Sequence, residues 1–253
     1  MIQYKKIHQE IELKKLTRLG TEIWGFSDSD VIPYHTLITI LQSGGVIFGA
    51  FLEGKLIGYS ISTFALKEEY SLYLYMLGVS KNYSSKGIAQ QLFLENKAFA
   101  IENNLNSIYW SFNPLDSKAA NLYLHKLNAV IRQSMAYNMY GLDNNGLPTD
   151  RFLAYLNISQ EITKKPIFDA HLPENIKIDQ SLLDESNKFN ANKCNIVAIE
   201  IPYNLNNLNM KEFMSNFRIL FDKYLKNYII VDFIRLKDQK KYYYLLNKRS
   251  NIL

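Results

Sequence analysis

The chain has 253 residues, of which 47% are hydrophobic and 21% are charged, proportions typical of a globular protein. Its formal net charge of +5 is modest and its basic residues are scattered, which argues against nucleic-acid binding but suits a polyanionic ligand. The single cysteine, Cys194, excludes an internal disulfide, and without a signal-peptide pattern or a long apolar run we expect a soluble cytoplasmic protein with no membrane partner.

The N-terminal part of the chain alternates between strand and helix patterns. The elements expected there are a strand at residues 2–7, a helix along Leu13, Leu16, Leu19 and Ile23, a helix from Pro33 towards Ser43, and a hairpin of strands at residues 46–52 and 56–64. The hairpin turns at Glu53-Gly54-Lys55, where glycine permits a tight connection.

An anion-binding pattern follows the next strand. Residues 70–79 are mostly apolar and predict a strand, a short polar loop comes next, and Gly87-Ile88-Ala89 opens an amphipathic helix. The first amides of such a helix lack intrahelical partners and lie at the positive end of its dipole, so they can hold a phosphate or pyrophosphate. Lys81 and Lys86 flank the loop. The glycine patterns of dinucleotide-binding and P-loop sites are both missing.

The rest of the chain is predicted to contain further strands and helices with one long connection. Strands are expected at residues 107–112, 130–140, 151–158, 196–201, 228–236 and 242–246, with helices at residues 117–126 and along Phe213 to Tyr224. Residues 159–194 are polar and interrupted by Pro166 and Pro173, which indicates a connection. We expect three parts: residues 1–145, residues 146–195 as a strand and connecting segment, and residues 196–253 as a β-α-β-β extension.

The loop motif and the order of elements resemble the GNAT superfamily of N-acetyltransferases. The family's loop usually reads Gln/Arg-x-x-Gly-x-Gly/Ala, and the corresponding segment here runs from Ser84 to Ala89, so Ser84 replaces the usual first side chain. The resemblance covers roughly the first 140 residues. It implies an α/β (α+β) fold with a mixed, mostly antiparallel twisted sheet flanked by helices, in which residues 1–145 bind acyl-CoA and a small extension follows.

A second likeness extends towards the C-terminus, to a branch of predicted acetyltransferases that carries a C-terminal extension. The matching residues are Trp110, Phe112, Pro114 and Leu115; Asn138, Tyr140 and Gly141; and Leu147, Pro148, Thr149, Asp150 and Arg151. Relatives of this branch look similar to acyltransferases associated with amino-acid N-succinylation. The resemblance therefore implies acetyl-CoA as the default donor, succinyl-CoA as another, and an amino acid as a plausible acceptor.

The resemblance also implies where acyl-CoA binds. Loop amides would hold the pyrophosphate, and backbone groups of the preceding strand would pair with the pantetheine arm. The residues expected to contact this co-substrate are Leu77, Gly78, Val79, Ser84, Ser85, Lys86, Gly87, Ile88, Ala89 and Ser117. An amine would attack the thioester directly, in agreement with the absence of a nucleophile motif. The 4 histidines form no ligand cluster, so no metal is expected.

The general acid is less clearly marked in this sequence. Members of the family often have an acidic tyrosine on the helix after the fifth strand. Counting back from Lys126 and Asn128 gives Leu124 at that position, and Tyr123 lies one residue away, about 100° around an α-helix. Tyr123 can serve only if the helical register differs, and core packing is its favoured role.

Other residues are weaker candidates for catalysis and substrate binding. Tyr140, Tyr73 and Tyr75 are further candidate acids, and Glu69, Glu68 and Glu200, or a chain of water molecules, could act as the base. Arg132 and Arg151 could each hold a substrate carboxylate through a bidentate guanidinium, or could form ion pairs with Asp143 or Asp150.

The sequence therefore predicts an acyl-CoA-dependent N-acyltransferase that acts on the amine of a small molecule, with a homodimer left open. The alternative is a catalytically idle CoA-binding or structural protein that keeps the fold. Ser84 at the Gln/Arg position and Leu124 at the tyrosine position favour this alternative.

Overall fold

The structure, a computed structural model, describes residues 1–25, 30–66, 69–133, 135–143, 145–167, 171–173, 176–182, 194–206, 208–236 and 238–251. It divides into two compact units, the first formed by Met1–Trp110 and Asn157–Gln160 and the second by Ser111–Leu156 and Glu161–Leu253. The boundaries of these units differ from those of the three expected ranges, because the strand at Val130–Ile131 pairs with the C-terminal strand at Tyr228–Leu236. The three ranges stay a prediction.

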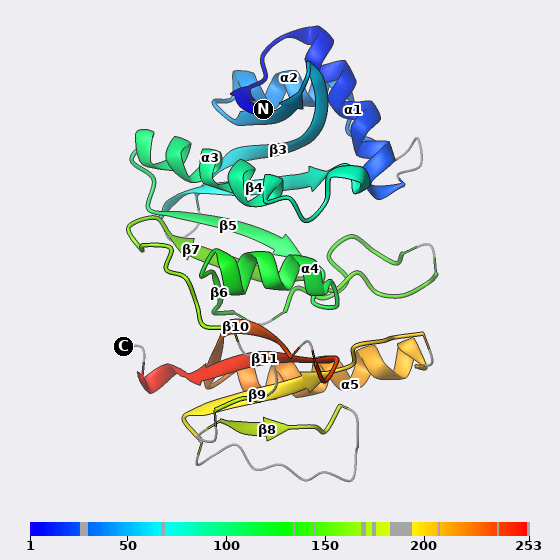
Figure 1. The fold of residues 1–253 in the computed structure, drawn as a ribbon, viewed down its shortest axis with the longest axis vertical. Coiled ribbons are helices and arrows are strands. Elements are labelled where there is room, and N and C mark those ends of the chain that lie inside the picture. The colour runs from blue at the N-terminus through cyan, green and yellow to red at the C-terminus, as the bar shows by residue number, and fades with distance from the viewer. Residues whose placement is uncertain are drawn as a thin grey trace. The chain divides into compact units, whose positions relative to one another are not determined.

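The first unit contains five neighbouring strands. In spatial and chain order they are β1 (Ile2–Lys6), β2 (Val46–Leu52), β3 (Lys55–Leu66), β4 (Tyr70–Val79) and β5 (Ser107–Phe112), whose last residues continue into the second unit. The first four are antiparallel, and β5 runs parallel to β4 (Figure 1). The β2–β3 hairpin has a two-residue turn, Glu53-Gly54, with φ of 51° and 75°, as a type I′ turn requires.

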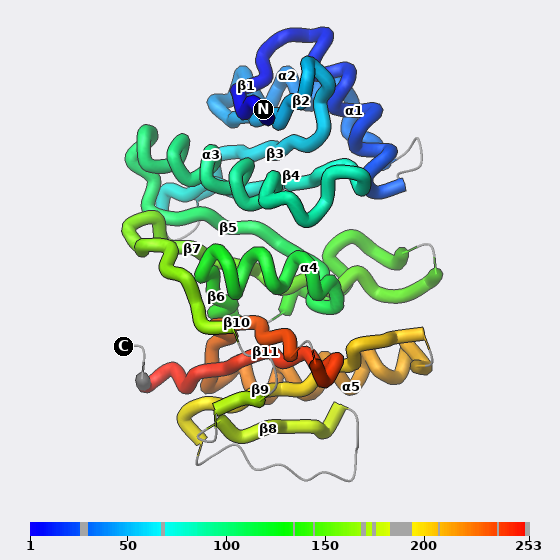
Figure 2. Tube along the Cα trace, viewed as in Figure 1, coloured from blue at the N-terminus to red at the C-terminus, as the bar shows by residue number. Residues whose placement is uncertain are grey.

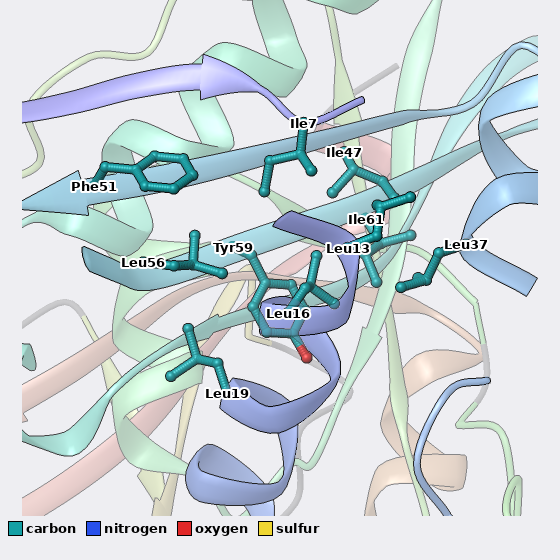
Figure 3. Packing of buried hydrophobic residues seen from close by; sticks show 10 residues of the cluster. All are labelled: Ile7, Leu13, Leu16, Leu19, Leu37, Ile47, Phe51, Leu56, Tyr59 and Ile61. Atoms are coloured by element: carbon teal, nitrogen blue, oxygen red, sulfur yellow. The ribbon is translucent and has the colours of Figure 1, made fainter. Parts of the chain in front are cut away.

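Helices cover both faces of these strands. Helices α1 (Glu10–Trp24) and α2 (Tyr34–Gln42) contribute to one buried cluster, in which Leu13, Leu16 and Leu19 of α1 pack with Tyr59 and Ile61 of β3 (Figure 3). On the other face, α3 (Ile88–Glu102) packs through Ile88 and Leu92. The nearly continuous burial along β2 follows from this arrangement, because both faces of the strand meet helices.

The second unit has its own strands and helices. The strand order is β7 (Phe152–Asn157), β6 (Val130–Ile131), β10 (Tyr228–Leu236), β11 (Lys241–Lys248), β9 (Ile196–Ile201) and β8 (Lys177–Asp179). Only β8 and β9 pair in parallel among those whose register is described. Helix α5 (Met210–Leu225) places Phe217 and Phe221 against Phe152 and Tyr244, which forms an aromatic core.

The helix after β5 has two parts. It begins as α4 (Ser117–Ala120) and continues as a π turn (Asn121–Lys126), in which Leu127 N donates to Leu122 O at 3.0 Å. The predicted helix at residues 117–126 is therefore present, but its second half is wound more loosely than an α-helix.

Two expectations about strands were wrong. The strand expected at residues 130–140 is only the two residues of β6, because the chain then turns and forms an isolated bridge between Ala136 and Arg151. The expected connection at residues 159–194 contains β8, which is three residues long and pairs with β9. Over the described ranges, no helix is both long and apolar enough to cross a membrane.

Candidate active site

The loop between β4 and α3 presents backbone amides. Figure 2 follows it from the end of β4 into α3. Its start is anchored, because Ser80 N donates to Ile57 O at 2.9 Å and Ser80 Oγ donates to Glu22 Oε1 at 2.6 Å. A 3₁₀ turn at Lys81–Tyr83 follows, and Ser84 is exposed and extended. Ser85 and Gly87 then have positive φ values of 63° and 80°. Such turns point successive N–H groups towards one side, where they can bind an anion.

Gly87 is the N-cap of α3, and no side chain in the described chain caps this helix. The first N–H groups of α3 are therefore without a capping acceptor, and the helix dipole favours negative charge beside them. A Cβ built at Gly87 meets no atom within 4 Å, so the protein itself leaves this space open. The requirement for glycine comes from its positive φ and from the approach of a ligand.

Two lysines belong to this loop. Lys81 and Lys86 are both exposed, and Lys86 Nζ lies 5.4 Å from the centroid of the Tyr83 ring. Both can add positive charge next to the uncapped helix terminus.

Strands β4 and β5 separate after a short paired region. Ser71, Leu72 and Tyr73 pair with Ser107, Ile108 and Tyr109, and no further pair joins the two strands among the described residues. The register of β4 against β3 shifts between Leu74 and Met76, so Tyr75 is an extra residue in a β-bulge. A bulge bends a strand, and this one follows the last β4–β5 pair directly.

Beyond the bulge, β4 has β3 as its ladder partner. Leu77, Gly78 and Val79 pair with Ser60, Tyr59 and Gly58, and in the described structure no strand pairs with their other edge. This edge leads directly to the loop and the start of α3. An extended ligand with amide groups could pair with it as a strand does, with its anionic end at the helix.

Two aromatic residues that the sequence did not single out support this part of β4. The Trp24 ring lies against Gly78, where a Cβ would come within 2.5 Å of Trp24 Cη2, so only glycine permits this contact. Trp24 also packs edge-on against Tyr59, with ring centroids 5.7 Å apart. Burial raises the pKa of Tyr59 well above its ordinary value, and the neighbouring Tyr75 adds to the shift.

In the second unit, the π turn changes the register around Tyr123. Asp116 caps α4 by accepting from Lys118 N and Ala119 N at 2.9 and 3.0 Å, and Ser117 is the first helical residue. A π turn holds one more residue than an α-helical turn. Counting back from Asn128 by α-helical spacing gives Leu124, whereas counting back by π spacing gives Tyr123.

Tyr123 is buried and aromatic contacts hold its ring. Only 9% of the residue is exposed, and its ring centroid lies 5.4 Å from that of Phe112 in β5. Burial raises the pKa of Tyr123 well above its ordinary value, and the charge of Asp116 acts in the same direction. The phenol is protonated at neutral pH, as it would be at its ordinary pKa, so it can donate a hydrogen bond, although the raised pKa makes it a weaker acid.

A half-buried lysine holds the π turn. Lys165 Nζ donates to Leu124 O at 2.7 Å and to Val231 O at 2.5 Å, and lies 3.5 Å from Asp232 Oδ1. His125 Nδ1 is 3.1 Å from the same Asp232 oxygen. Burial lowers the pKa of Lys165, and Asp232 partly offsets this effect. Segments far apart in the chain thus fix the turn that carries Tyr123.

Two other predicted residues come together near the end of β5. Tyr140 Oη lies 3.3 Å from Ser111 Oγ, and the guanidinium carbon of Arg151 lies 5.4 Å from the centroid of the Tyr140 ring. Arg132 lies elsewhere, with its guanidinium carbon 4.0 Å from the centroid of the Tyr155 ring. Neither arginine forms the ion pair with Asp143 or Asp150 that the sequence left open: in the described chain, Asp150 pairs with Arg218.

The three glutamates that the sequence offered as general bases lie in different settings. Glu69 is half-buried, and its backbone oxygen accepts from Ser71 Oγ at 3.1 Å. Glu200 is buried among Gln180, Tyr243 and Lys241 in the C-terminal part, which indicates a structural role. Glu68 lies outside the described residues.

The comparisons with known proteins agree with this geometry. Residues 11–128 match the model of the acetyltransferase (GNAT) family. A comparison with curated proteins finds no match.

Solved acetyltransferase structures share the fold at low sequence identity. The ribosomal-protein-S18-alanine N-acetyltransferase from Escherichia coli is 16% identical, with a TM-score of 0.53 over 64% of this chain and 96% of its own. A putative acetyltransferase from Acinetobacter baylyi ADP1 is 15% identical, with a TM-score of 0.54 over 65% and 97%. The NatC complex bound to Gag peptide and CoA contains a chain that is 20% identical, with a TM-score of 0.52 over 62% and 98%.

Proposed function

We propose that this protein transfers an acetyl group from acetyl-CoA to the amine of a small molecule, because residues 11–128 match the model of the acetyltransferase (GNAT) family. The observation that carries the proposal is the continuous path from the unpaired edge of β4 to the uncapped start of α3. Pantetheine carries amide groups that suit the strand edge, and CoA carries a pyrophosphate that suits the helix terminus.

The reaction needs no covalent enzyme intermediate. The neutral amine attacks the thioester carbonyl, a C–N bond forms, the C–S bond breaks, and the sulfur leaves as a thiolate. The protein must orient the reactants, accept a proton from the amine and return one to the thiolate. We assign the second task to Tyr123, because the π turn places this residue where π spacing counts back from Asn128, and the first to Glu69 or to water.

The acceptor is proposed to be a small molecule, with an amino acid as the favoured class, and succinyl-CoA is a second donor to test. Tyr140 and Arg151 support an acceptor-binding role by their proximity at the end of β5. We place the protein in the cytoplasm and expect that it needs no metal. Whether it forms a homodimer is to be measured in solution.

One observation favours a second reading, a protein that binds CoA without turnover. Ser84 stands where the family usually has Gln or Arg, and its short exposed side chain offers less to a phosphate. Free CoA, acetyl-CoA and succinyl-CoA should each raise the thermal unfolding midpoint if either reading is correct. Release of free thiol that depends on an added amine supports the enzyme. Binding without amine-dependent thiol release, across a broad panel of amines, would support the second reading.

A further inference from the structure

Among the described residues, Arg151 is a half-buried cation without an ion-pair partner. It directly precedes β7, and no carboxylate oxygen of the described chain lies within ion-pair distance of its guanidinium. Burial lowers the pKa of Arg151, although the charges of Tyr140, Asp116 and Asp150 act in the opposite direction. A partly desolvated guanidinium without a bound anion is an unfavourable arrangement, and a ligand anion would relieve it.

The neighbouring Arg218 shows how this protein pairs an arginine when the pairing is structural. Its Nε and Nη2 donate to the two oxygens of Asp150 at 2.6 Å each, and the Asp150 side chain is 0% exposed. Asn138 N donates to the same carboxylate at 2.9 Å. This hydrogen bonding raises the pKa of Arg218. Asp150 is thus fully engaged, although it is next to Arg151 in the sequence.

The other nearby carboxylate is also in use. Asp116 Oδ1 accepts from Lys118 N and Ala119 N, which caps α4. Its charge reaches Arg151 only through space, without a hydrogen bond. The guanidinium N–H groups of Arg151 therefore form no hydrogen bond with Asp150 or Asp116 in the described structure.

The guanidinium carbon of Arg151 lies 5.4 Å from the centroid of the Tyr140 ring, whose hydroxyl in turn contacts that of Ser111. Tyr140 is 52% exposed, and its hydroxyl is 3.3 Å from Ser111 Oγ. The backbone around Tyr140 is held in place, because Tyr140 N donates to Thr149 Oγ1 at 2.8 Å and Thr149 N donates to Gly141 O at 3.1 Å. A planar guanidinium can bind a carboxylate through two parallel N–H donors, and a hydroxyl group can donate one further hydrogen bond to it.

We infer that the acceptor of the proposed acyltransferase carries a carboxylate, which Arg151 binds together with the hydroxyls of Tyr140 and Ser111. The inference rests on the proposed function for the identity of the ligand as the acceptor. Arg132 does not share this setting, because it is exposed and lies on the Tyr155 ring without a neighbouring hydroxyl pair in the described structure.

The test uses pairs of amines that differ only in the carboxylate: amino acids with apolar, polar and acidic side chains against their decarboxylated amines. Thiol release from acetyl-CoA should be faster for the amino acid of a productive pair by about 10- to 100-fold in kcat/KM, the range that charged hydrogen bonds contribute. Arg151→Met should remove this preference by raising KM for the amino acid only. Arg151→Lys should restore part of it, because lysine keeps the charge but loses the planar fork. Arg18→Met, at an exposed arginine of α1, is the matched control and should leave kcat/KM unchanged for both the amino acid and its decarboxylated amine.

A binding measurement separates this inference from the proposed function. With saturating free CoA, amino acids should raise the unfolding midpoint of the wild-type protein but not that of Arg151→Met. Carboxylate binding without thiol release from any amine would support the site and count against the acyltransferase. Equal rates within every amine pair would overturn the inference and leave the acyltransferase standing. A loss of acetyl-CoA affinity in Arg151→Met would also overturn it, because the anion would then be a CoA phosphate.

Discussion

Replacing Gly87 with glutamate should abolish most acetyl-CoA binding while the protein stays folded. At φ of 80°, a residue with a Cβ costs about 1–2 kcal/mol. No atom lies within 4 Å of the position that a Cβ would take at Gly87, so no steric cost is added. A carboxylate at the start of α3 stabilises the folded protein by about 0.3–1 kcal/mol through its interaction with the helix dipole. The net loss of stability should therefore be about 1 kcal/mol.

The effect on binding should be larger, because the new side chain blocks the amides and repels the pyrophosphate. Loss of two hydrogen bonds to a charged group corresponds to about 3 kcal/mol, or more than ~100-fold in the dissociation constant. Isothermal titration with acetyl-CoA measures it. Gly54→Glu is the matched control, since Gly54 has φ of 75° and equally open surroundings in the β2–β3 turn. Binding by Gly87→Glu within about threefold of the Gly54→Glu control would refute the assignment of this loop to the pyrophosphate.

Three further predictions concern the second unit. Tyr123→Phe should lower kcat about 100-fold with an unchanged dissociation constant for acetyl-CoA, and wild-type turnover would instead leave Tyr123 a packing role. Lys165→Met should also lower kcat by loosening the π turn, yet add little to Tyr123→Phe in the double variant; additive losses would count against this coupling. Burial raises the pKa of Tyr123 and Tyr244 above the ordinary 10.0, so the unfolded chain loses these protons first as the pH rises. Unfolding in urea should therefore show stability falling above about pH 10, by roughly 1.4 kcal/mol per pH unit for each tyrosine, and a constant or rising value there would contradict it.

Local patterns predicted the elements that frame the candidate site. Strand β4 and the start of α3 lie where the apolar run and Gly87 placed them, because strand periodicity and glycine preference are both short-range effects. The bulge at Tyr75 and the separation of β4 from β5 could not be predicted this way, since both depend on pairing with other strands.

The second unit shows where local patterns fail. The π turn at Asn121–Lys126 is stabilised by Lys165, about 40 residues further along the chain, so helical periodicity alone did not predict the looser winding around Tyr123. The long strand expected at residues 130–140 is replaced by turns around Asp150, whose partner Arg218 lies 68 positions away. A single sequence carries no signal for either contact.

The central claim is that this chain moves an acyl group from CoA to an amine. The most direct test is continuous detection of free thiol from acetyl-CoA with purified protein and a panel of amino acids, with mass spectrometry of the acceptor. We predict that at least one amino acid gives thiol release at a rate proportional to enzyme concentration, together with a product heavier by one acetyl group. Saturable acetyl-CoA binding with no thiol release or acetylated product from any amine would contradict the claim.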